Sequence, residues 1–102
     1  MDILDVIPMD EPGSFRLVGE LDLASAERLE PILREAAEGN GGITLDLTEL
    51  TFMDSTGIRV ILSTVRSLDG QGPLVLLRPS YIVRRVLDVS LPDGLPGLEI
   101  RD

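Results

Sequence analysis

The sequence lacks three residue types on which much protein chemistry depends. It contains no cysteine and no histidine, and all nine of its basic residues are arginine, so lysine is absent as well. Without cysteine there are no disulfides, thiolate metal sites or cysteine nucleophiles. Without lysine there is no Schiff base and no phosphate-loop lysine. Only carboxylates, hydroxyls and guanidinium groups remain, so we expect a protein that is not an enzyme and needs neither a metal nor another cofactor.

Aromatic residues and positive charge are also scarce. The 102 residues include two Phe, one Tyr and no Trp, and the formal net charge is −9. The core must therefore be built from Leu, Ile, Val and Ala, a mixture typical of helices packed on a sheet. The negative charge opposes binding to nucleic acid or to an anionic membrane surface. Other proteins are the expected partners.

Long apolar runs are missing too. No stretch approaches the roughly 20 apolar residues of a membrane helix. Residues 1–8 alternate acidic with apolar side chains and lack the basic start of a signal peptide. These features predict a cytoplasmic chain. No repeat, low-complexity tract or long linker divides it, and its length suits one core, so we interpret residues 1–102 as one domain.

Hydrophobic patterning predicts an alternation of strands and helices. Strands are expected from alternating or continuous apolar runs at 3–8, 15–21, 43–47, 74–77 and 98–100. Helices are expected where apolar residues keep helical spacing. They cover residues 24–38, a segment that directly follows 54–57 and ends at 68, and Ser80 to Val89. The pattern predicts an α/β fold, with a mixed central sheet of four to five strands and about four helices packed on it.

Two of the predicted helices have unusual details. Pro31 lies inside the first one and predicts a kink or a tightened segment, at a cost of about 3 kcal/mol in an otherwise regular helix. In the last helix, Ser80 is expected to cap the N-terminus. Ile82, Val86 and Val89 are expected to form its buried side.

An acidic, hydroxyl and glycine turn joins the third predicted strand to the second predicted helix. It consists of Asp54, Ser55, Thr56 and Gly57. The first amides of a helix lack internal partners, the helix dipole adds about half a positive charge there, and Gly57 removes a side chain that would shield this end. The fold should therefore tolerate a phosphoryl group on Ser55. Alternatively, Ser55 is only an N-cap, and Asp54 only a carboxylate that favours the helix dipole.

The same turn carries a resemblance to a known family. The run FMDSTGI at 52–58, after an alternating strand, resembles the anti-sigma factor antagonists of the STAS domain family. The resemblance continues through VGELDLASAERL at 18–29, LDLTEL at 45–50 and VRRVLDV at 83–89, so it covers nearly all of the chain. The chain departs from the family pattern at Ser90-Leu91-Pro92, where a small residue and Gly are usual, which opens a different path for the last segment.

The resemblance implies a phosphorylation-controlled switch that binds another protein. In this family the Ser directly after the Asp is phosphorylated by a partner anti-sigma kinase, and Ser55 matches it. The unphosphorylated form sequesters the anti-sigma factor and releases the sigma factor, and the phosphorylated form lets go. The expected partners are an anti-sigma factor with serine-kinase activity and, as a further candidate, a phosphatase acting on Ser55. The candidate partner-binding residues are Asp22, Asp54, Ser55, Thr56, Gly57 and Arg59.

Several alternatives stay open. A STAS domain can also serve as an unphosphorylated scaffold or accessory subunit, for example in lipid transport, and its binding would then be constitutive. Arg59 has an equally good explanation as an ordinary solvated helix residue. An enzyme with Ser55 as nucleophile and Asp54 or Asp22 as base is disfavoured, because a carboxylate with a pKa near 4 is a poor base for a serine hydroxyl.

Overall fold

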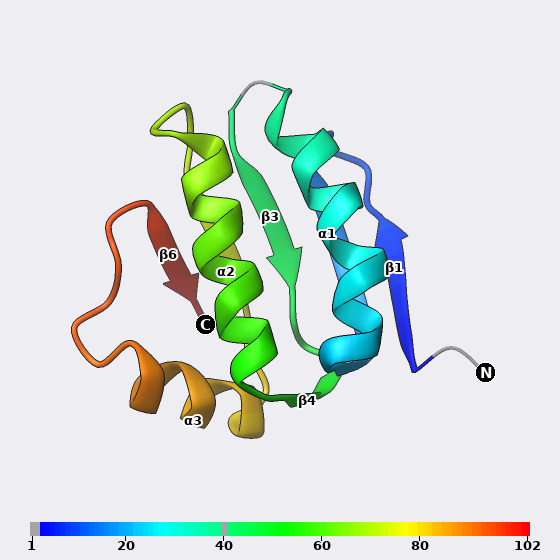
Figure 1. Cartoon of the computed structure of the whole chain (residues 1–102), viewed down its shortest axis with the longest axis vertical. Coiled ribbons are helices and arrows are strands. Elements are labelled where there is room, and N and C mark those ends of the chain that lie inside the picture. Colours follow the sequence, from blue (N-terminus) through cyan, green and yellow to red (C-terminus); the bar gives the residue numbers. More distant parts are fainter. Residues whose placement is uncertain (1–2, 40) are drawn as a thin grey trace.

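The computed structural model describes residues 3–39 and 41–102, and it confirms the predicted α/β fold (Figure 1). Six strands and three helices occur in this part of the chain. In order along the chain, the elements are β1 (Leu4–Pro8), β2 (Ser14–Leu21), α1 (Leu23–Ala37), β3 (Ile43–Asp46), β4 (Leu50–Met53), α2 (Ser55–Leu68), β5 (Leu74–Leu77), α3 (Tyr81–Ser90) and β6 (Leu98–Arg101).

One mixed sheet contains all six strands, in the order β1-β2-β3-β5-β6, with β4 also paired to β2. β1 and β2 form an antiparallel pair, and the other pairs are parallel. β3 pairs with the beginning of β2 and β4 with its end, so β3 and β4 act as two halves of one interrupted strand. The sequence did not predict β4 as a strand. A register shift at Gly19 and Glu20 interrupts its pairing, and its burial does not alternate.

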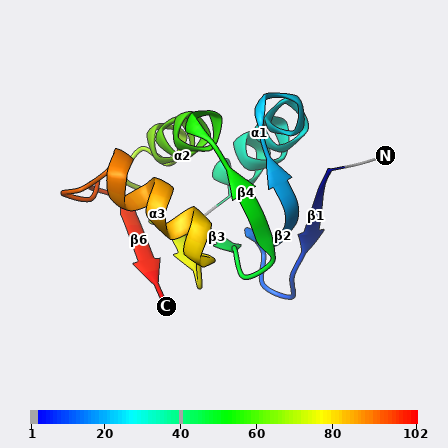
Figure 2. The ribbon, with the colours of Figure 1, turned by 90° about the horizontal axis from the view of Figure 1, so that it is seen from below.

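The helices leave one face of the sheet bare. α1 and α2 lie side by side on one face, and α3 lies at the end of the sheet near β4 (Figures 1 and 2). The space between sheet and helices is filled by aliphatic side chains, as the composition predicts. Its largest fully buried apolar side chains are Leu4, Leu17, Leu29, Leu33, Ile43, Leu50, Leu68, Leu74, Leu76, Val83 and Leu87.

The helices differ from expectation in number and in the effect of proline. Three form in the described residues, where about four were expected. The segment between α3 and β6 contains two prolines and two glycines, which disfavour helix. α1 runs without a break through Pro31, whose side chain is exposed. After α3 the chain turns back and adds β6 parallel to β5, which is the path taken beyond Ser90-Leu91-Pro92.

The last helix packs through a face that matches the predicted one only in part. Val83 and Leu87 are buried, and Val86 is half-buried against the core, but Ile82 and Val89 are 54% and 77% exposed, so the prediction was wrong for these two residues. α3 carries two apolar stripes, and its contact with β4 selects one of them. Ser80 stands at the N-cap as predicted but makes no capping bond: its Oγ donates to the Leu50 carbonyl at 2.7 Å, which ties α3 to β4.

A buried carboxylate holds the break between β3 and β4. Asp46 is 2% exposed. Its Oδ1 accepts from the Thr48 amide at 3.0 Å and the Thr48 hydroxyl at 2.7 Å, and its Oδ2 accepts from Arg78 Nη2 at 2.7 Å. Burial by itself raises the pKa of Asp46, but the hydrogen bonds from Thr48 and Arg78 outweigh it and hold the pKa below its ordinary value. Because Thr48 lies between the two strands, this carboxylate helps to fix where β4 begins.

We predict that Asp46→Asn lowers the free energy of unfolding by about 1–3 kcal/mol at pH 7, since the hydrogen bonds from Thr48 and Arg78 lose their buried, charged acceptor. The folded-state pKa is depressed, so the stabilisation is complete above the unfolded-state value, about 3.9, and is lost as the pH falls through the folded-state value. Urea unfolding at pH 7 and at successively lower pH therefore should show the two proteins converging. Asp5→Asn, at an exposed carboxylate on β1, is the control. A gap that stays constant with pH would point to a steric effect.

Candidate functional site

Two strand-to-helix junctions lie side by side at one edge of the sheet. Leu21 of β2 and Met53 of β4 are register partners in a parallel pair. Each is followed by an aspartate that caps the next helix, Asp22 for α1 and Asp54 for α2. Neighbouring strands are about 4.8 Å apart, so two helix N-termini adjoin at this edge, as the lower ends of α1 and α2 show in Figure 1. Their dipoles place partial positive charge at the same spot.

Asp54, and not Ser55, is the N-cap of α2. Asp54 Oδ1 accepts the Thr56 backbone amide at 2.8 Å. Ser55 is the first residue of the helix and is exposed, and its hydroxyl makes no hydrogen bond within the residues that the structure describes. The alternative in which Ser55 is merely a cap is therefore wrong. The hydroxyl stands free at the surface.

Gly57 has a different role from the predicted one. It is buried, and a Cβ added to it would lie 2.2 Å from Met53 Cγ and 3.2 Å from Leu21 Cδ2. The missing side chain thus lets α2 pack closely on β2 and β4, and does not serve to unshield the helix end. Gly57 has no side chain with which to touch a partner, so its part in the site is to set the position of the turn.

The α1 junction has a reciprocal cap that sequence reasoning missed. The Ser25 amide donates to Asp22 Oδ1 at 3.0 Å, and the Asp22 amide donates to Ser25 Oγ at 2.9 Å. Ser25 is 1% exposed, and its hydroxyl also reaches the Glu20 carbonyl at 2.9 Å. A cap followed three residues later by a second polar residue is the sequence signal that points to such a pair. It holds Asp22, which is half-buried, beside the α2 junction.

Arg59 is exposed, as predicted, but it is not simply solvated. Its Nη2 lies 3.3 Å from Glu30 Oε1, an ion pair that links α2 to α1. The side chains are 59% and 27% exposed respectively. Glu30 was not among the candidate residues. A contact between separate helices leaves no local spacing in the sequence, so no pattern could have revealed it.

The junction has no machinery for covalent catalysis by Ser55. Its hydroxyl is not hydrogen-bonded to a carboxylate, and Asp54 already uses Oδ1 for the cap. Within residues 3–39 and 41–102, no group of three or more acidic side chains is placed to hold a metal ion. No helix in that part of the chain is long and apolar enough to cross a membrane. What the junction offers is an accessible hydroxyl at the first residue of α2, next to the junction that begins α1.

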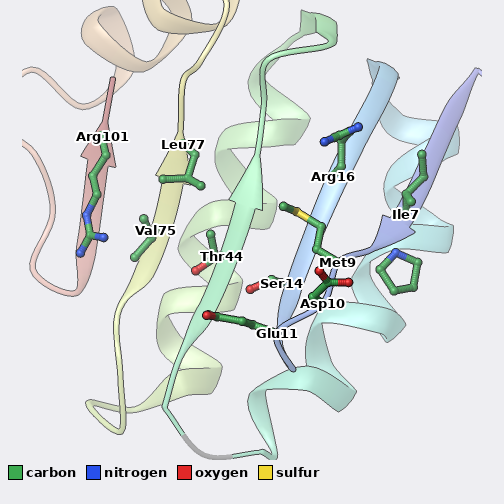
Figure 3. A pocket seen from close by; sticks show the side chains of 11 residues that line it. Ile7, Met9, Asp10, Glu11, Ser14, Arg16, Thr44, Val75, Leu77 and Arg101 are labelled. Atoms are coloured by element: carbon green, nitrogen blue, oxygen red, sulfur yellow. The ribbon is translucent and has the colours of Figure 1, made fainter.

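A hollow in the surface lies away from this junction. It is an open groove of about 660 Å³ on the helix-free face of the sheet, as Figure 3 shows. Its lining includes Arg16, Thr44 and Leu77, and none of the residues of the Ser55 junction. The groove and the Ser55 junction are therefore separate features of the surface.

Known proteins share this fold and part of this sequence. The STAS domain model matches residues 6–91. The anti-sigma F factor antagonist of Lysinibacillus sphaericus is 37% identical over 79 residues, which span 74% of this chain and 67% of that protein. The solved structure of the anti-sigma factor antagonist SpoIIAA in its unphosphorylated form matches with a TM-score of 0.74 and 27% identity, over 95% of this chain and 86% of that chain. The Bacillus cell fate determinant SpoIIAA in the phosphorylated form matches with a TM-score of 0.68 and 25% identity, over 95% and 89%.

The chain therefore belongs to the STAS domain family. Within that family its relatives place it in the class of anti-sigma factor antagonists, which are switch proteins and not enzymes.

The assignment of the cap leads to a stability prediction. Asp54→Ala should lower the free energy of unfolding by about 1 kcal/mol, because the Thr56 amide loses its acceptor. Ser55→Ala should change it by less than about 0.5 kcal/mol, because an exposed hydroxyl without a partner contributes little. Urea unfolding of the two variants beside the wild type measures both values. The reverse ranking would make Ser55 the cap.

The close packing of Gly57 can be tested by its effect on stability. Gly57→Ala should lower the free energy of unfolding by about 1–3 kcal/mol, because the clash with Met53 and Leu21 outweighs the gain of about 1 kcal/mol in helix propensity. Ser67→Ala, at an exposed position of the same helix, is the control for propensity alone. A Gly57→Ala protein as stable as the wild type would show that Met53 moves aside at no cost.

Proposed function

We propose that this protein is a phosphorylation-controlled switch that binds an anti-sigma factor when Ser55 is unmodified and releases it when Ser55 is phosphorylated. The supporting observation is the free, exposed hydroxyl of Ser55 at the first residue of α2, with the cap supplied by Asp54. A similar structure, that of SpoIIAA, is known in both unphosphorylated and phosphorylated forms.

The fold can accept the modification. A phosphoryl group adds about 1.5–2 negative charges and three acceptor oxygens. At Ser55 these stand in solvent beside two helix N-termini, where amides without helical partners and the helix dipoles favour negative charge. Ser55 is exposed, so the phosphate displaces no packed side chain. The effect of phosphorylation is therefore on the surface and not on the core.

Phosphorylation reduces the complementarity between this protein and the surface of its partner. A surface fitted to a neutral hydroxyl faces, after phosphorylation, a charge that it cannot solvate. A difference of about 2.8 kcal/mol in binding free energy weakens binding about a hundredfold. Because Ser55 is exposed at the surface, the switch needs no change of fold.

The proposed partner surface centres on Ser55. It contains the exposed or half-buried residues Asp22, Asp54, Thr56 and Arg59, with Gly57 holding the turn from beneath. Exposed apolar side chains stand next to these residues along the chain, namely Leu23 at 64% exposure and Phe52 at 40%. Apolar groups among polar ones are typical of a protein interface.

The proposed partners are proteins of one regulatory circuit. The anti-sigma factor would carry the serine kinase that modifies Ser55, and a phosphatase would restore the hydroxyl. This chain would be the substrate in both steps, in the cytoplasm. Such a role needs no nucleotide site in this chain.

Binding of paired variants tests the proposal. The anti-sigma factor from the same genome should bind Ser55→Ala about as tightly as the wild type and Ser55→Asp at least tenfold more weakly, by isothermal titration calorimetry. Ser67→Asp adds the same charge at an exposed position near the far end of α2 and should bind normally. Equal affinity of all the variants would contradict the switch and support constitutive binding by a scaffold or accessory subunit.

A further inference from the structure

The ion pair between α1 and α2 lies one helical turn from the switch residue, and this placement suggests a second component of the switch. We propose, on the basis of the function proposed above, that Arg59 leaves Glu30 and pairs with the phosphate when Ser55 is phosphorylated. Phosphorylation then alters α1 as well as α2, because the carboxylate of Glu30 loses its partner.

The spacing within α2 favours the new pair. Ser55 and Arg59 are four residues apart in one helix, so they share a face and are within reach of each other. The negative group stands N-terminal to the positive one, which is the more favourable order. Arg59 is also the first basic residue of α2; the next, Arg66, is two turns further along.

The existing pair is weak enough to exchange. It joins one nitrogen, Arg59 Nη2, to one oxygen of Glu30 at 3.3 Å, and the arginine is 59% exposed. Exposed single-contact pairs contribute little to stability. A phosphate dianion carries more charge than a carboxylate and can accept two parallel hydrogen bonds from a guanidinium group. The exchange replaces a single contact by a stronger one.

The charges around the phosphate also favour its pairing with Arg59. Asp22 and Asp54 are both at this edge of the sheet, and each caps a helix through its carboxylate. A phosphate on Ser55 therefore adds negative charge to a site that already holds two carboxylates. The helix dipoles offset part of that repulsion. A guanidinium group within reach of the phosphate would reduce it further.

The exchange extends the effect of phosphorylation from α2 to the surface of α1. In the unmodified protein, Arg59 and Glu30 neutralise each other across the two helices. After the exchange, α1 displays an unpaired Glu30, and the guanidinium group of Arg59 is engaged with the phosphate. A partner that touches both helices then meets two changes at once. An aspartate at position 55 has one short carboxylate and would reproduce this only in part.

Titration of the phosphate itself tests the inference. Phosphoserine is placed at position 55 during translation, so the test does not require the kinase, and the second pKa of the phosphate is measured by phosphorus NMR. Arg59→Gln should raise that pKa by about 0.2–0.4 unit, the size expected for an i,i+4 ion pair. Glu30→Gln should leave it unchanged or lower it, because Arg59 is then freed. Arg66→Gln, in the last turn of the same helix, is the control and should have no effect.

The outcomes separate this inference from the function on which it rests. An unchanged phosphate pKa in Arg59→Gln, equal to that in Arg66→Gln, would overturn the exchange while leaving the partner switch intact. A raised pKa in Arg59→Gln together with equal affinity of the unmodified and phosphorylated proteins for the anti-sigma factor would support the exchange and overturn the switch. Circular dichroism of each variant establishes that α2 remains folded.

Discussion

The hydrogen bond from the Thr56 amide to Asp54 Oδ1 determines which residue of the turn is structural and which is free. Because the Asp54 carboxylate caps the helix, the hydroxyl of the next residue, Ser55, is not needed as a cap. The pairing of Leu21 with Met53 then puts this junction next to the one capped by Asp22. An accessible hydroxyl at the start of α2, beside a second helix N-terminus, results from these local interactions.

The rest of the structure keeps that junction in place. Asp46 fixes the break before β4, the Ser80 hydroxyl ties α3 to the start of β4, and buried Gly57 sets the approach of α2 to the sheet. None of these contacts involves the Ser55 hydroxyl. A chemical change at the hydroxyl therefore alters the surface that a partner meets, without breaking any contact that holds the fold.

Periodicity in the sequence predicted the α/β fold, the main strands and the first two helices, because each of these has one clear apolar face. It failed where a segment is short or has two such faces. β4 is four residues long with an interrupted register, and α3 carries two apolar stripes. The motif located Ser55, but which residue caps α2, the packing of Gly57 and the pairing of Arg59 with Glu30 depend on three-dimensional contacts, which leave no pattern along the chain.

The most direct test of the central claim is to map phosphorylation on the protein isolated from its native host. Cleavage after arginine releases residues 35–59, in which Ser55 is the single serine, together with four threonines. Fragmentation of that peptide in a mass spectrometer distinguishes them. Phosphate on Ser55, in a fraction that changes with growth conditions, is the predicted result. A peptide without phosphate under all conditions, or with phosphate on Thr56 alone, would contradict the claim that Ser55 is the switch.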